Sequence, residues 1–168
     1  MDQLAAHGYK TADLDYCLLT HMDIDHAGGI GEVKEAGHIL CSAAEWQAAN
    51  KHNPRYLRRL WRDVNIETFA DEPFDLFQDG TIIAFPMHGH SAGMTAIRVG
   101  SKDRYLIIAG DAGYGRPSWQ RQVLPGVEWN RKETKQSLKK LRALALDPHC
   151  EAILMTHDPE NTKPTFEF

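Results

Sequence analysis

Short apolar runs recur along the chain, and each is followed by a polar or glycine-rich segment. Apolar runs of this length are typical of strands, whereas apolar positions three and four residues apart are typical of helices. The pattern predicts strands at residues 16–20, 38–41, 81–85, 95–99, 104–109 and 151–156, within a strand-like region that begins at residue 66. It predicts helices at residues 2–7, 29–36, 43–50, 51–64 and from 131 to the Asp147–Pro148 pair.

Two of these helix starts carry a side-chain capping signal. Ser42 is followed three positions later by Glu45, and Asn130 in the same way by Glu133. Residues 51–64 include four arginines, which would form the basic face of an amphipathic helix. Such a face is most often solvated, and the alternative is a basic rim that attracts an anionic substrate. Residues 115–127, which are rich in Gly, Pro and Trp, are expected to form a loop.

The most unusual stretch is residues 20–29, Thr-His-Met-Asp-Ile-Asp-His-Ala-Gly-Gly. Four side chains that can bind a metal fall within six positions of it: His21, Asp23, Asp25 and His26. The stretch follows the apolar run 16–19, which reads as a buried strand, and precedes a turn into a short helix. Because unpaired buried charge is poorly tolerated, packing alone does not explain this cluster. The sequence therefore predicts a metal site on a strand-to-helix loop.

Three further residues of the same kind follow other predicted strands. Taken alone, His90 could be a turn residue, Asp111 a helix N-cap and His157 a loop histidine. Each nevertheless comes directly after an apolar run, and a sheet gathers such residues at one edge. The sequence therefore favours their convergence on one site.

In this order, the segments HMDIDHAGG, GHSAG, GDAGY and THD resemble the metallo-β-lactamase superfamily, and in particular its N-acyl homoserine lactonase-like branch. The resemblance covers nearly the whole chain from about residue 10 onward. It implies a fold of the α/β (α+β) class, the αββα sandwich of that superfamily. Residues 1–168 would then form a single domain that holds the C-terminal majority of this fold.

The resemblance also implies a centre of two divalent metal ions, with zinc first and manganese or iron as alternatives. One ion would be held by His21, Asp23 and His90. The other would be held by Asp25, His26 and His157, with Asp111 bridging the two.

The activity implied by the resemblance is hydrolysis of a lactone or related ester by a hydroxide that bridges the two ions. Tyr114 would hydrogen-bond the substrate carbonyl, although a tyrosine here could also be a stacked core or rim residue. Asp25 would carry a proton to the leaving alkoxide. His88 has no matching role and reads as a supporting or surface residue.

The chain departs from the usual HxHxDH motif of the family at Asp23, which stands where the second histidine is expected. The centre then contains three carboxylates in place of two, which makes it less positive and its ligand set harder. On this argument, Asp23→His is expected to shift metal preference toward zinc and to lower the pH optimum.

The second departure lies at the N-terminus, where 20 residues precede His21. Several strands of the family fold are expected before this motif, so part of one sheet is expected to be missing. Exposed sheet surface and an open strand edge favour association, and we expect a homo-oligomer.

Composition limits the partners and the compartment. A net charge of −4 argues against nucleic acid, and no apolar run approaches a membrane span of about 20 residues. The N-terminus has no signal-peptide pattern, and the odd, widely spaced Cys17, Cys41 and Cys150 suggest reduced thiols and a cytoplasmic protein.

The expected partner is a small-molecule ester or lactone. Its pocket is expected to draw on Met22, Trp46, Trp61 and Trp119, although each of these could instead be a core residue. The alternatives are a phosphodiesterase or thioesterase of the same fold, or a non-catalytic remnant that acts as a binding module.

Overall fold

The structure is a computed structural model that describes residues 2–51, 53–161 and 166. The chain divides into two compact units, Met1–Phe69 and Ala70–Phe168, which are called the first and the second unit below. That the two units together form a single domain stays a prediction. No helix in the described part of the chain has both the length and the apolarity that crossing a membrane needs.

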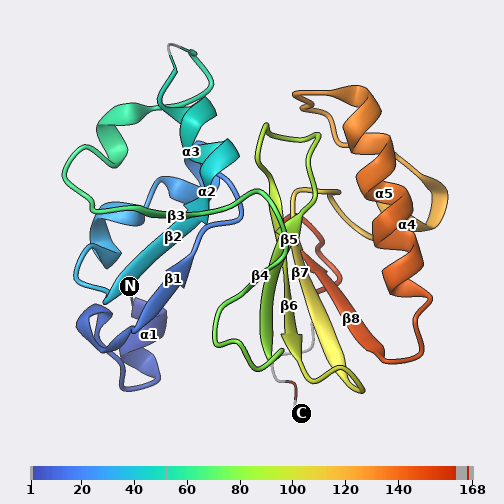
Figure 1. Ribbon diagram of the computed structural model, residues 1–168, viewed down its shortest axis with the longest axis horizontal. Coiled ribbons are helices and arrows are strands. Elements are labelled where there is room, and N and C mark those ends of the chain that lie inside the picture. Colours follow the sequence, from blue (N-terminus) through green and yellow to red (C-terminus); the bar gives the residue numbers. More distant parts are fainter. Residues whose placement is uncertain (1, 52, 162–165, 167–168) are drawn as a thin grey trace. The chain divides into compact units, whose positions relative to one another are not determined.

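The first unit contains a three-stranded sheet in which all neighbours are parallel (Figure 1). Its strands, in spatial order, are β1 (Tyr16–Leu18), β2 (His38–Ser42) and β3 (Glu67–Phe69). The helical segments are α1 (Asp2–Ala6), η1 (Thr11–Asp13), α2 (Ile24–Ala27), η2 (Ile30–Val33), α3 (Ala43–Ala49) and η3 (Arg58–Leu60), where η marks a 3-10 helix.

Most of the predicted elements of this unit are confirmed, but the segment around the motif differs. β1 was expected to be buried, yet Tyr16 is exposed and Cys17 is only half-buried, because among the described residues β1 pairs only with β2 and so forms an edge of the sheet. The helix predicted at residues 29–36 is a single 3-10 turn, and a separate helix, α2, begins earlier at Ile24. The side chain of Ser42 accepts a hydrogen bond from the Glu45 backbone N–H, which confirms the predicted cap of α3.

The prediction of an amphipathic helix at residues 51–64 is wrong. In the described part of this segment only η3 is helical. Pro54 explains the difference, because it has no backbone N–H and disfavours a helical conformation at the residue before it. Asn53 forms a turn in which its side-chain oxygen accepts from the Arg55 backbone N–H at 2.9 Å.

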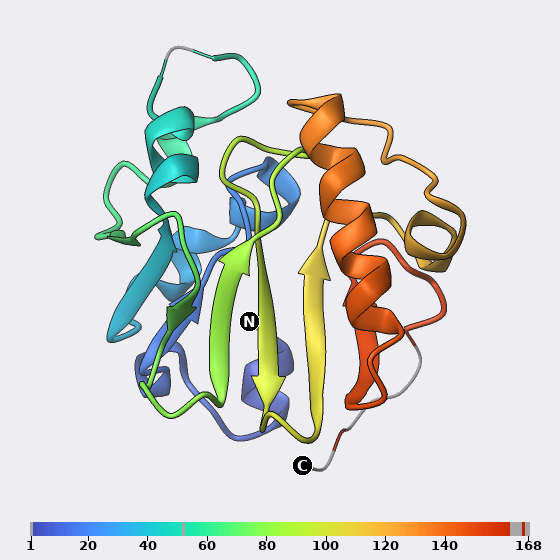
Figure 2. The ribbon, with the colours of Figure 1, turned by 45° about the vertical axis from the view of Figure 1, so that its right-hand side comes forward.

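The second unit contains a five-stranded sheet in the order β4-β5-β6-β7-β8 (Figure 2). Its strands are β4 (Phe74–Asp75), β5 (Ile82–Pro86), β6 (Thr95–Gly100), β7 (Tyr105–Gly110) and β8 (Cys150–Met155). Neighbours are antiparallel except β7 and β8, which are parallel. The helices are α4 (Arg116–Arg121) and α5 (Arg131–Ala145).

α5 covers one face of this sheet (Figure 2). Leu138 and Leu141 are fully buried in a cluster with Ile107 and Met155, as their helical spacing predicts. The Asn130 side chain caps the helix by accepting from two backbone N–H groups of its first turn. The prediction of a loop at residues 115–127 is wrong in part, because α4 lies within these residues. Its Pro117 stands in the first turn, where proline is favoured rather than disruptive.

The strand directions of the second unit determine where its polar residues lie. β5 and β7 are both antiparallel to β6, and β8 is parallel to β7, so these three strands run the same way. Their C-terminal ends therefore meet at one edge of the sheet. His90, Asp111 and His157 follow these ends, as the sequence predicts.

Candidate metal centre

The motif of the first unit lies partly on a loop and partly on a helix. His21 is fully buried and follows β1 after a short connection, while Asp23 occupies the N-cap position of α2. Asp25 and His26 lie on α2 itself, so the expected loop cluster is split between loop and helix. This arrangement places histidine and carboxylate side chains in pairs at the start of α2.

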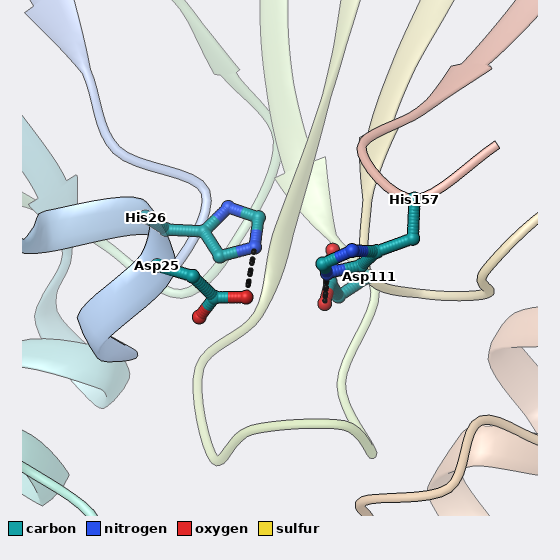
Figure 3. Close-up of side chains that lie close together, drawn as sticks. All are labelled: Asp25, His26, Asp111 and His157. Carbon is teal, nitrogen blue, oxygen red and sulfur yellow. Dashed lines mark ion pairs between the residues drawn. The ribbon is translucent and has the colours of Figure 1, made fainter. Parts of the chain in front are cut away.

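Two such pairs form within the first unit. His21 Nε2 lies 3.5 Å from Asp23 Oδ2, and His26 Nε2 lies 3.7 Å from Asp25 Oδ2, a pair drawn in Figure 3. Two ligand atoms bonded tetrahedrally to one zinc ion are about 3.4 Å apart, given bonds of about 2.0–2.2 Å. Both pairs therefore have the separation that two ligands of one ion require.

The second unit contributes a matching set around one carboxylate. Asp111 Oδ2 lies 3.7 Å from His90 Nε2 and 3.1 Å from His157 Nε2, and Figure 3 shows the His157 pair. The Asp111 side chain is 2% exposed, whereas that of His157 is 42% exposed. A single buried oxygen that faces two histidines has the arrangement expected of a bridging ligand.

The hydrogen bond of His90 indicates which of its nitrogens can bind a metal. Its Nδ1 lies 2.9 Å from the Val127 carbonyl oxygen, which can only accept, so Nδ1 carries the hydrogen. In the neutral ring Nε2 then has a lone pair, and it faces a carboxylate oxygen of Asp111. Two acceptors that face each other favour a cation between them, so this donor set suits a metal ion.

Two residues of the first unit that sequence reasoning did not place at the site support the motif. Glu45 is fully buried and accepts a hydrogen bond from the Met22 backbone N–H at 3.0 Å. Arg55 donates through Nε to Asp23 Oδ1 and through a terminal nitrogen to Asp23 Oδ2, both at 2.6 Å. Burial alone lowers the pKa of Arg55, but the hydrogen bonds and charge of Asp23 outweigh it and raise that pKa.

Sequence reasoning assigned Glu45 only to the cap of α3 and Arg55 only to a helix face. The extra carboxylate at Asp23 was the available signal, because a partly buried charge needs a nearby counter-charge.

Tyr114 lies against the histidines of the second unit. Its ring is edge-on to those of His90 and His157, with centroid distances of 6.0 Å and 5.1 Å. Its backbone N–H donates to Ser118 Oγ at 3.1 Å, which fixes the turn after Asp111 to α4. Tyr114 therefore lies beside two of the predicted metal ligands of this unit, and its expected hydrogen bond to a substrate carbonyl stays a prediction.

The histidine just before the GHSAG segment forms an ion pair elsewhere. His88 Nε2 pairs with Asp71 at 2.8 Å, which agrees with its reading as a supporting or surface residue.

The predicted pocket residues divide between core and cavity. Met22 is fully buried and Trp61 is 4% exposed, so the bulk of both side chains is core. Trp46 and Trp61 nevertheless border a cavity of about 540 Å³ in the first unit, which is also lined by Arg58, Arg59 and Arg62. Trp119 packs against the core of the second unit and lines a separate cavity of about 420 Å³.

Histidine and carboxylate pairs of this kind, which lie after strands and at the start of α2, could hold divalent metal ions. Residues 1–148 match the metallo-beta-lactamase superfamily, and the chain belongs to it. This confirms the resemblance carried by the four ordered motifs.

Several relatives are lactonases by name. The chain is 28% identical to the N-acyl homoserine lactonase AttM of Rhizobium radiobacter, over 100% of this chain and 68% of that protein. It is 29% identical to the AttM lactonase of Azorhizobium caulinodans, over 94% of this chain and 63% of that protein. The chain thus spans about two thirds of the length of these relatives.

A solved structure confirms the fold class. An N-acyl homoserine lactone hydrolase with the product N-hexanoyl-L-homoserine at its catalytic metal centre matches with a TM-score of 0.82 and 22% identity. The match covers 99% of this chain and 65% of that one. The predicted metallo-β-lactamase fold is therefore confirmed.

Proposed function

We propose that this chain is a metal-dependent hydrolase that opens a lactone or a related ester, of the N-acyl homoserine lactone kind. The observation that carries the proposal is Tyr114, whose ring lies against His90 and His157 beside the buried Asp111. A phenol at this place can donate a hydrogen bond to a substrate carbonyl. Relatives named as N-acyl homoserine lactonases support the same substrate class.

We further propose that the two histidine and aspartate groups act together as one centre for two divalent ions. The first ion would use His21, Asp23 and His90, and the second Asp25, His26 and His157, with Asp111 shared. Ligand-like separations within each unit support this assignment. Zinc is the preferred ion, since one neighbour of the same fold, AidC, is described as a dizinc lactonase (TM-score 0.77, 17% identity). Manganese and iron are the alternatives.

The metal ions, when bound, would polarise the substrate carbonyl and make water a nucleophile near neutral pH. Tyr114 would donate its hydroxyl hydrogen to the carbonyl oxygen as negative charge develops there. As the ring C–O bond breaks, the leaving alkoxide needs a proton. Asp25, whose side chain is 51% exposed, would take a proton from the attacking water and deliver it to that oxygen.

A metal analysis and a substrate panel test this function. We expect close to two zinc ions per chain, and hydrolysis of a homoserine lactone in preference to a thioester or to bis-p-nitrophenyl phosphate. Tyr114→Phe should lower kcat by about 100-fold, the usual effect of losing one such donor, without lowering metal content. His90→Gln should lower metal content, whereas His88→Gln, its neighbour in the same loop, should not.

Three outcomes would overturn the proposal. Preference for the phosphodiester would indicate a phosphodiesterase, and preference for a thioester would indicate a thioesterase. Absence of bound metal after zinc is supplied would indicate a non-catalytic binding module.

Two further predictions accompany this proposal. Homo-oligomer formation is tested by light scattering, where a monomer would contradict it. A cytoplasmic location, inferred from the three free cysteines, is tested by fractionation of the native cells.

A further inference from the structure

Asp23 and Arg55 form a two-point ion pair within the first unit. Both Asp23 oxygens accept from the Arg55 guanidinium at 2.6 Å, one from Nε and one from a terminal nitrogen. The side chains are 14% and 15% exposed, so solvent screens the pair only weakly. Paired, partly buried charges of this geometry are among the stronger polar contacts in proteins.

Asp23 also stands where the family motif has a histidine. A neutral histidine at this position would add no charge to the centre, whereas the aspartate adds one negative charge. The guanidinium of Arg55 adds one positive charge in direct contact with it. The net charge of the pair is therefore that of the neutral histidine.

We propose that Arg55 is a positioning residue that holds the Asp23 carboxylate and balances its charge, so that the two residues together replace the histidine of the motif. This inference rests on the proposed function, because it takes Asp23 to be a metal ligand. No assignment of Arg55 follows from the family motif, since the residue lies 32 positions from Asp23 in a segment outside the four motifs.

The contact leaves Asp23 able to bind an ion. A carboxylate offers about four lone-pair positions, and Arg55 occupies two of them, one on each oxygen. Asp23 Oδ2 still lies 3.5 Å from His21 Nε2, the separation of two ligands of one ion. Ligating carboxylates are commonly held by a second hydrogen bond of this kind, which fixes their orientation.

The backbone around Arg55 is itself held in place. Its N–H donates to the Asn53 side chain at 2.9 Å, and the next residue, Tyr56, is 5% exposed. The guanidinium also feels the negative charge of the buried Glu45. Arg55 is therefore a cation held in place by Asp23 and by its own turn rather than a mobile surface side chain. A lysine would supply the charge but not the two-point geometry.

The first test measures the pair without metal. Urea midpoints are compared, in the presence of a chelator, for the unsubstituted protein, Asp23→His, Arg55→Met and the double variant. Arg55→Met should lower the midpoint because Asp23 loses its counter-charge, and it should not lower it when position 23 is already histidine. The control is Arg58→Met, which removes an exposed arginine of the same segment and should leave the midpoint unchanged.

The second test measures zinc affinity by competition with a chromophoric chelator. Asp23→His alone leaves Arg55 as an uncompensated cation beside the ion, so zinc binding should weaken. Adding Arg55→Met should restore affinity by about tenfold or more, since like charges near an ion repel it. Arg55→Lys in the unsubstituted background should retain most of the effect of the positive charge on zinc affinity, but it should no longer orient the Asp23 carboxylate by a two-point contact.

The two tests separate the possible failures. If the unsubstituted protein binds no zinc, the proposed function fails. If Arg55→Met changes the urea midpoint equally with aspartate and with histidine at position 23, the pairing itself is overturned. If zinc binds but Arg55→Met lowers affinity equally in both backgrounds, the charge-balancing role is overturned. If the effect of Arg55→Met on the urea midpoint depends on the residue at position 23 but its effect on zinc affinity does not, the pair is purely structural, and the inference is likewise overturned.

Discussion

Gly89 lies between His88 and His90 at the point where this loop meets the start of α5. Its backbone φ angle of +127° is one that residues with a side chain rarely adopt. A Cβ atom there would lie 2.2 Å from the Thr134 backbone nitrogen and 2.4 Å from its Cα, whereas ordinary contacts begin near 3.4 Å. Gly89→Ala therefore requires the loop or α5 to move by about 1 Å.

The expected loss follows from two contributions. The backbone strain amounts to about 1–2 kcal/mol, and the overpacking against α5 to about 1–3 kcal/mol. Gly89→Ala should thus lower the free energy of unfolding by about 2–5 kcal/mol, a large share of the roughly 5–15 kcal/mol of an ordinary domain. Urea denaturation followed by tryptophan fluorescence measures this difference directly.

Gly126→Ala is the matched control in the same unit. A Cβ atom at Gly126 would meet nothing within 4 Å, and its φ lies outside the restricted region. Its free energy of unfolding should change by no more than about 0.5 kcal/mol. Equal values for the two alanine variants would refute the steric argument.

Two further substitutions test contacts outside the proposed ligands. Glu45→Ala should lower the free energy of unfolding by about 2–4 kcal/mol, because the Met22 N–H loses its acceptor, while Glu45→Gln keeps an acceptor and should lose less; equal losses in urea denaturation would contradict this. The pKa of Asp147 is lowered by hydrogen bonds from the His149 backbone and then from the Tyr105 hydroxyl, so its stabilising contribution is present above its unfolded pKa of about 4 and is lost as pH falls through the folded value. The urea midpoint of Asp147→Asn should therefore lie below that of the unsubstituted protein at pH 7 and approach it near pH 3, and a constant difference would argue against this assignment.

The elements that sequence reasoning placed correctly are those with local signals. Ser42 and Asn130 cap helices through hydrogen bonds to residues two or three positions away, so a short pattern identifies them. Four of the five strands of the second unit, β5 to β8, follow from apolar runs. His90 and Asp111 then follow from those strands, because strands that run the same way end at the same edge.

The elements that it missed depend on single residues that overrule a pattern, or on contacts between distant ones. The spacing of residues 51–64 suits a helix, but Pro54 disrupts it. Pro117 has the opposite effect, because proline at a first turn begins α4 in a segment whose composition suggests a loop. The Glu45 backbone N–H donates to Ser42 in the cap of α3, and its side chain accepts from the distant Met22 N–H. Only the second contact links Glu45 to the site.

Asp23 shows how such a distant contact changes a chemical expectation. From the motif alone, a third carboxylate makes the centre less positive, and Asp23→His should move metal preference toward zinc. With Arg55 bound to Asp23, the same substitution removes a negative charge but leaves the guanidinium in place. The centre then carries one positive charge more than a histidine motif without this arginine. We therefore expect Asp23→His alone to weaken zinc binding, and the gain in zinc preference to emerge only when Arg55→Met accompanies it. Tighter zinc binding by the single variant would show that Arg55 does not balance the charge at Asp23.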